Sequence, residues 1–115
     1  MACPYCGSTL ESAWFLTEDA AALPHPTPLT ACHMIVIPRR HVSAFYDLDV
    51  GEQRGIWDVV TMLRERIAAA LPVAGFHAGF RDVPPDGHAE VHLVPRVRGS
   101  RLVLPPEIEW VDLDS

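Results

Sequence analysis

The sequence contains no lysine, because all nine of its basic residues are arginine. Without a lysine amine, neither Schiff-base chemistry nor the phosphate-binding lysine of a P-loop is available to this chain. The 15 acidic residues outnumber the nine basic ones and give a formal net charge of −6. This charge disfavours nucleic acid or an anionic membrane surface as a partner.

Long apolar runs and paired cysteines are also lacking. No apolar run reaches the length of a membrane span, and residues 1–22 lack the basic start and apolar stretch of a signal peptide. Three cysteines make an odd count, and Cys3 and Cys6 lie three positions apart, so a disulfide framework is disfavoured. We therefore expect a cytoplasmic protein with one domain, residues 1–115.

Apolar patterns predict short strands at residues 13–17, 33–37, 75–80 and 89–94. The proline-rich stretch that begins at Leu23 predicts a loop or a sheet edge, because proline cannot donate to a strand ladder.

One long helix is predicted after Asp49, which forms a capping box with Glu52, and it ends at Leu71 before Pro72. Its apolar stripe is formed by Ile56, Val59, Val60, Leu63 and Ile67. Strands on both sides of one long helix predict an α+β fold with a mostly antiparallel sheet.

The first motif that carries chemistry is the pair Cys3 and Cys6. A Cys-x-x-Cys turn lets two thiolates converge on one metal ion, and zinc prefers four such ligands in a tetrahedron. A redox pair is the alternative, although redox motifs open a helix after a strand and this one lies at the start of the chain. Six histidines offer the two further ligands, and spacing alone does not choose among them.

The second motif lies in the predicted strand at residues 88–96. Alternate side chains of a strand share a face, so His88, Glu90 and His92 project together while Ala89 and its alternating apolar neighbours face a core. Three titratable groups on one face of an apolar strand are costly unless they are exposed, paired or bound to metal. The third motif, residues 33–41, has His33 at one end of a strand and His41 beyond Pro38.

Taken together, these motifs resemble the histidine-triad (HIT) family. The resemblance covers Cys3 to about Trp110 and is most specific in residues 33–42 (HMIVIPRRHV) and 88–96 (HAEVHLVPR). It implies an α+β fold in which one long and one short helix accompany a five-stranded antiparallel sheet. It also implies a homodimer that joins two such sheets, and a C-terminal tail whose Trp-containing strand reaches the partner subunit.

The resemblance further implies a nucleotide-binding hydrolase or transferase of nucleoside phosphates or phosphoramidates. In the family, the middle histidine of the triad attacks the α-phosphate. Some bacterial members carry one structural zinc, and the ligands transferred by this resemblance are Cys3, Cys6, His41 and His88.

Several positions depart from the family pattern. Glu90 occupies the middle, nucleophilic position, where a carboxylate would form a mixed anhydride and repel an anionic phosphate. His77 stands where an asparagine is common, Arg81 where an amide contacts phosphate, and His25 near the position of the ribose-binding acid. These three are the candidate substrate-binding residues.

Three hypotheses follow. In the first, the protein hydrolyses a phosphorylated substrate: Glu90 is a general base on water, His92 contacts the phosphate or the leaving group, and His33 supports the site. In the second, it is a zinc-stabilised ligand-binding or regulatory module without turnover. In the third, Glu90, His92 and His33 hold a second, catalytic metal.

Overall fold

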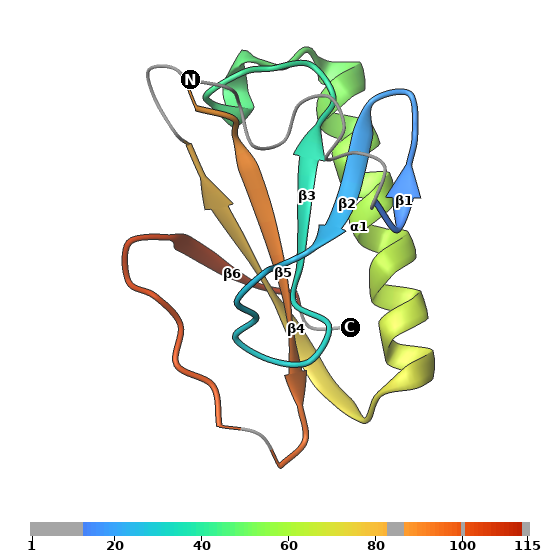
Figure 1. Ribbon diagram of the computed structural model, residues 1–115, viewed down its shortest axis with the longest axis vertical. Helices are drawn as coiled ribbons and strands as arrows, with labels where there is room; N and C mark the ends of the chain where they lie inside the picture. The colour runs from blue at the N-terminus through green and yellow to red at the C-terminus, as the bar shows by residue number, and fades with distance from the viewer. Residues whose placement is uncertain (1–12, 83–86, 100, 114–115) are drawn as a thin grey trace.

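The computed structural model describes residues 13–82, 87–99 and 101–113. A single antiparallel sheet carries one long helix on one face (Figure 1). The sheet has six strands in the order β1-β2-β3-β5-β4-β6. The strands are β1 Phe15–Leu16, β2 Ala20–Pro24, β3 Met34–Pro38, β4 Val73–Arg81, β5 Glu90–Val97 and β6 Glu109–Leu113. The α+β prediction is therefore confirmed.

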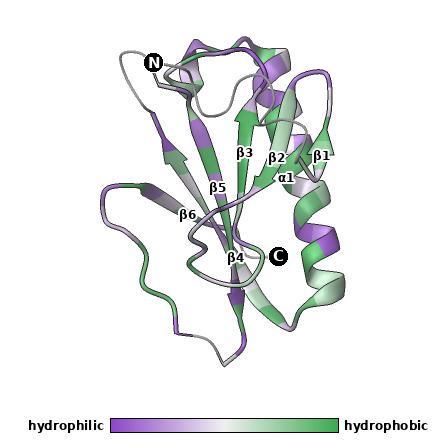
Figure 2. Cartoon of the chain, viewed as in Figure 1, coloured by the Kyte–Doolittle hydropathy of each residue, from purple (hydrophilic) through white to green (hydrophobic). Residues whose placement is uncertain are grey.

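The long helix α1 runs from Val50 to Ala70 and buries the predicted stripe against the sheet. The short 3-10 helix η2, Phe45–Asp47, precedes it. Figure 2 shows both hydrophobic and hydrophilic residues along α1, and the hydrophobic residues of the predicted stripe are the ones that are buried. Among the described residues, no helix has both the length and the apolarity that a membrane crossing requires.

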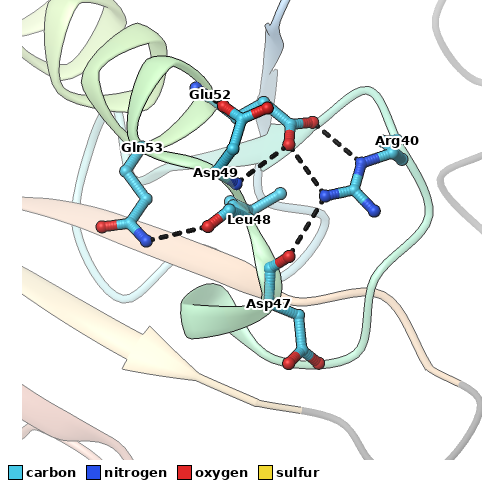
Figure 3. A network of polar contacts seen from close by, with 6 residues as sticks. All are labelled: Arg40, Asp47, Leu48, Asp49, Glu52 and Gln53. Atoms are coloured by element: carbon cyan, nitrogen blue, oxygen red, sulfur yellow. Dashed lines mark hydrogen bonds and ion pairs between the residues drawn. The ribbon is translucent and has the colours of Figure 1, made fainter.

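The predicted capping box begins α1 (Figure 3). The Asp49 carboxylate accepts a bond from the Glu52 main-chain N–H at 2.7 Å, and the Glu52 carboxylate accepts one from the Asp49 N–H at 3.1 Å. Arg40 donates to both oxygens of Glu52, at 2.8 and 3.0 Å. These bonds, that of Arg40 foremost, lower the pKa of Glu52 to about 2, so the Glu52 carboxylate stays ionised well into acid.

Two parts of the sheet differ from the expectation. The strand β2 was missed because Ala20–Ala22 carries no strand signal, yet tertiary packing buries all three alanines completely. The expected five-stranded sheet has six strands, because β6 pairs with β4 of its own chain. The tail was correctly predicted to contain a strand, and that strand, β6, pairs with β4 at the edge of the sheet.

Alternation along the strands divides the sheet into two faces. On the helix side, Met34, Val36, Val91 and Leu93 belong to the main core. The opposite face, called here the open face, carries a smaller buried cluster of Ala21, Leu23, Ile35 and Ile37. The two polar residues of β5, Glu90 and His92, lie on this open face because they alternate with Val91 and Leu93.

Among the described non-glycine residues, Cys32 alone has a left-handed backbone conformation, with φ of 63°. A side chain with a Cβ costs about 1–2 kcal/mol in this region. Cys32→Gly and Cys32→Ala both remove the thiol, so they differ only in the Cβ. We expect the glycine variant to be more stable than the alanine variant by about 1 kcal/mol in urea unfolding. Equal stabilities, or a more stable alanine variant, would contradict the strain.

Candidate histidine pocket on the open face

Antiparallel pairing brings His25 and His33 together at the turn between β2 and β3. Leu23 faces Ile35 in the ladder, and the next step of that register pairs the main-chain N–H of His25 with the carbonyl of His33 at 2.9 Å. Both imidazoles therefore lie on the open face, and their rings stack with centroids 4.3 Å apart. The Thr30 hydroxyl fixes this turn by donating to the Pro95 carbonyl of β5 at 2.8 Å.

The central strand β5 adds His92 and Glu90, and β4 adds Arg81. In the ladder His92 lies between Ile35 of β3 and Gly79 of β4, and Glu90 lies opposite Arg81. The Nε2 of His33 is 3.0 Å from Nδ1 of His92, and Nε2 of His92 is 3.1 Å from Oε1 of Glu90. Arg81 Nη1 is 3.4 Å from the same oxygen.

These groups differ sharply in exposure. His33 and His92 are each 3% exposed and Glu90 is 6% exposed, whereas the guanidinium of Arg81 is half-exposed. Burial, followed by the neighbouring His25 and His92, lowers the pKa of His33 to about 3. Burial and then His92 also lower the pKa of His25. Both imidazoles are therefore neutral at physiological pH.

A cavity of about 210 Å³ opens over these residues. The sheet side of its wall consists of His25, His33, His92 and Arg81. The other side consists of Pro105, Glu107 and Ile108, which precede β6. This volume is below the roughly 300–1,000 Å³ of small-molecule pockets, so it suits a phosphoryl-sized group. Arg81 and Glu107 also line a larger cavity of about 570 Å³ beside η2.

The C-terminal wall was not predicted as part of the site. Trp110 of β6 contacts the His92 ring with centroids 6.2 Å apart, and its indole N–H donates to the Pro105 carbonyl at 2.8 Å. Gly79 makes this approach possible, because a Cβ there would lie 2.6 Å from Trp110 Cζ3 and 2.7 Å from Ile108 Cγ2. No sequence pattern marks Gly79 for this role.

The remaining predicted site residues lie apart from this cavity. His77 pairs across the strands with Asp112 of β6, with Nδ1 and Oδ1 2.6 Å apart. His41 and His88 approach each other with ring centroids 5.0 Å apart, and Nε2 of His88 donates to the Pro38 carbonyl at 2.6 Å. Burial is the main cause that lowers the pKa of His88. The predicted ligands Cys3 and Cys6 lie outside the described residues.

The hydrogen bonds of the pocket histidines bear on whether these histidines could bind a metal ion. His25, His33 and His92 have ligand atoms within 4.8 Å of one another, close enough to hold a metal ion. However, Nδ1 of His25 accepts from the Thr27 N–H at 3.0 Å, and Nδ1 of His33 accepts from the Leu29 N–H at 3.1 Å. A neutral imidazole that accepts at Nδ1 carries its proton on Nε2. Metal-ligating histidines normally donate from the second nitrogen, so this hydrogen-bond pattern disfavours a metal here.

Comparison with known proteins begins with sequence. No protein-family model matches the chain. The chain is 26% identical over 90 residues to a bifunctional bis(5′-adenosyl)-triphosphatase/adenylylsulfatase, FHIT, of Arabidopsis thaliana. The aligned region covers 75% of this chain and 50% of that protein, so this chain spans about half the length of its curated relative.

Three solved structures share the fold. A HIT family protein from Bacillus anthracis has a TM-score of 0.67 and 22% identity, over 84% of this chain and 73% of that one. A Streptococcus mutans protein has a TM-score of 0.70 and 21% identity, over 82% and 62%. A hypothetical protein from Leishmania major has a TM-score of 0.60 and 20% identity, over 81% and 69%. The fold is that of HIT family structures, and the sequence match supports the resemblance seen in the motifs.

The contact between Gly79 and Trp110 yields a stability test. Gly79→Ala should destabilise the protein by about 2 kcal/mol, because the added methyl group meets the indole and Ile108. Combining it with Trp110→Ala should cost less than the sum of the two single changes, as expected for groups in contact. Gly51→Ala is the matched control, since its Cβ meets Asp49 Oδ1 at an ordinary 3.4 Å. Additive costs in urea unfolding would refute the contact.

Proposed function

We propose that this chain is a histidine-triad protein that binds a nucleoside phosphate and hydrolyses a bond at its phosphorus by an altered route. The observation that carries the proposal is the position of Glu90, which contacts both His92 and Arg81, two residues that line the cavity. The resemblance of the motifs to the HIT family supports the nucleotide part. The Arabidopsis relative, a bis(5′-adenosyl)-triphosphatase and adenylylsulfatase, supports the same general class of reaction.

The altered route follows from the chemistry of a carboxylate. Glu90 takes a proton from a water molecule, the water oxygen bonds to phosphorus, and the bond from phosphorus to the leaving group breaks. The leaving group takes its proton from solvent, and Glu90 returns its own proton to solvent. A carboxylate has sites for about four hydrogen bonds, so contacts with His92 and Arg81 are compatible with binding a water. Arg81, half-exposed at the cavity, offsets the charge of the phosphoryl group.

A ligand-binding module without turnover is the second candidate. It is favoured by the same hydrogen bonds, because Oε1 of Glu90 already accepts from both His92 and Arg81. In this case a ligand would raise the melting temperature while no product forms.

Changes at Glu90 separate the two candidates. Glu90→Gln keeps the shape but removes the base, so hydrolysis of an adenosine phosphoramidate should fall by about 100-fold or more. Glu90→His should introduce a nucleotidylated intermediate, detectable by mass spectrometry of the intact protein. Asp58→Asn, an exposed change on α1, is the control expected to leave turnover unaltered.

The results distinguish the candidates as follows. Turnover by the unaltered chain that is lost in Glu90→Gln supports the hydrolase. Turnover by Glu90→His alone supports a binding module in which Glu90 blocks the reaction. Wild-type turnover that persists in Glu90→Gln would refute Glu90 as the base.

A structural zinc is a separate part of the proposal, with Cys3, Cys6, His41 and His88 as its ligands. The 5.0 Å separation of the His41 and His88 rings supports two of the four. Donation from Nε2 of His88 to the Pro38 carbonyl is the orienting bond typical of a metal-ligating histidine, and with it Nδ1 would be the nitrogen that binds a zinc ion. Such a closed site would stabilise the fold and take no part in the reaction. A cytoplasmic homodimer belongs to the same proposal and rests on the resemblance.

Metal analysis of protein purified without chelators tests this part. We expect one zinc per chain, and we expect Cys3→Ser or His88→Ala to lose the zinc and lower the melting temperature, because metal binding contributes to folding. His77→Ala should keep its zinc, since His77 lies against Asp112 instead. Zinc-free wild-type protein would rule the site out.

A further inference from the structure

A larger cavity adjoins the histidine pocket at Arg81. Its volume is about 570 Å³, within the roughly 300–1,000 Å³ of small-molecule pockets. Arg81 and Glu107 line both cavities, so the two share part of their wall. A ligand whose phosphoryl group lies in the histidine pocket therefore has the larger cavity beside it.

Three aromatic side chains line this larger cavity, called here the aromatic chamber: Phe45 and Tyr46 of η2 and Phe80 of β4. The Phe45 ring meets the rings of Phe80 and Tyr46 edge to face, with centroids 5.6 and 5.8 Å apart. The Asp82 carboxylate accepts a hydrogen bond from the Phe45 main-chain N–H at 3.0 Å, which fastens η2 to the end of β4. The fold itself therefore holds the aromatic wall in place.

Tyr46 is the part of this wall that the core does not use. It is 85% exposed, whereas Phe45 is 8% exposed and belongs to the main core. Aromatic rings in contact attract each other beyond the effect of the area they bury, and tyrosine is enriched at binding surfaces for this reason. Tyr46 thus presents a flat apolar surface at the chamber to the ring of a ligand.

The charged side chains of the chamber indicate which ligand groups it disfavours. Asp82, Glu107 and Glu109 line it together with one cation, Arg81. Three carboxylates against one guanidinium repel an additional phosphate group. The chamber therefore favours an aromatic ring that is uncharged or cationic.

We propose that the aromatic chamber binds the leaving group of the substrate and selects one that carries an uncharged or cationic aromatic ring. The inference rests on the proposed function, in which a bond from phosphorus to a leaving group breaks. His25, the candidate residue for contact with the ribose, follows β2 at one end of the histidine pocket, and Arg81 lies on β4 at the other. The nucleoside toward His25 and the leaving group beyond Arg81 would then lie on opposite sides of the phosphorus.

Two phosphodiesters of equal charge test the selection: the benzyl and methyl esters of adenosine 5′-monophosphate. The benzyl ester should bind about tenfold more tightly by calorimetry, because only its ring can pack against Tyr46. Adenosine 5′-diphosphate, which has a phosphate in place of the ring, should bind no more tightly than the methyl ester.

Variants at Tyr46 test where the ring binds, and the exposure of this side chain makes a folding defect unexpected. Tyr46→Ala should bring the affinities of the two esters to within about twofold, whereas Tyr46→Phe should keep the preference because the ring remains. Trp14→Ala is the matched control, since Trp14 is an exposed aromatic residue that lines a different cavity. It should keep the wild-type preference.

Equal affinities of the two esters for the wild type, or an unchanged preference in Tyr46→Ala, would overturn the inference while leaving nucleotide binding intact. Diphosphate binding as tight as that of the benzyl ester would overturn it as well. Failure of all three ligands to bind would overturn the proposed function, and the role of the chamber with it. Nuclear Overhauser effects between the benzyl and Tyr46 ring protons are expected in the complex, and their absence would place the leaving group elsewhere.

Discussion

The bond from Nε2 of His92 to the Glu90 carboxylate is the interaction on which the open face of the sheet depends. Glu90 is 6% exposed, and a carboxylate buried to this degree costs several kcal/mol unless it is paired and hydrogen-bonded. His92 meets this requirement only because His33 supplies the donor for its other nitrogen, and His33 in turn accepts from the Leu29 main chain. The turn between β2 and β3 therefore takes part in holding the His92 ring against Glu90.

One face of the sheet packs in the main core, and the opposite face carries the polar residues of the candidate site. Val91 and Leu93 join the apolar stripe of α1 in the main core, which supplies most of the apolar burial. Glu90 and His92, one step along the same strand, lie on the open face, where His92 lines the pocket and contacts Glu90. A shift of one residue in the β5 register would exchange the two sets, placing a carboxylate against the helix. The core thus holds the register that the site requires.

The C-terminal segment turns this open face into a cavity. Its strand β6 pairs with β4, and Trp110 lies across Gly79 against His92. The indole bond to the Pro105 carbonyl holds the loop that contributes Glu107 and Ile108 to the wall. Packing over a glycine is needed because any side chain at Gly79 would occupy the space of the indole. The C-terminal segment that fills the sheet edge therefore also forms the wall of the pocket.

The sequence by itself determined what depends on neighbours along the chain. The capping box at Asp49, the stripe of α1, and the shared face of Glu90 and His92 follow from local periodicity, and the structure agrees with each. Only tertiary structure decided what depends on pairing between distant segments. Strand β2 forms because burial overrides the weak propensity of alanine, and β6 fills an edge that no local pattern identifies. Tertiary structure likewise decided the direction of the hydrogen bonds that run from His33 through His92 to Glu90. The Leu29 main-chain N–H sets this direction by donating to His33, and that contact leaves no mark in the sequence.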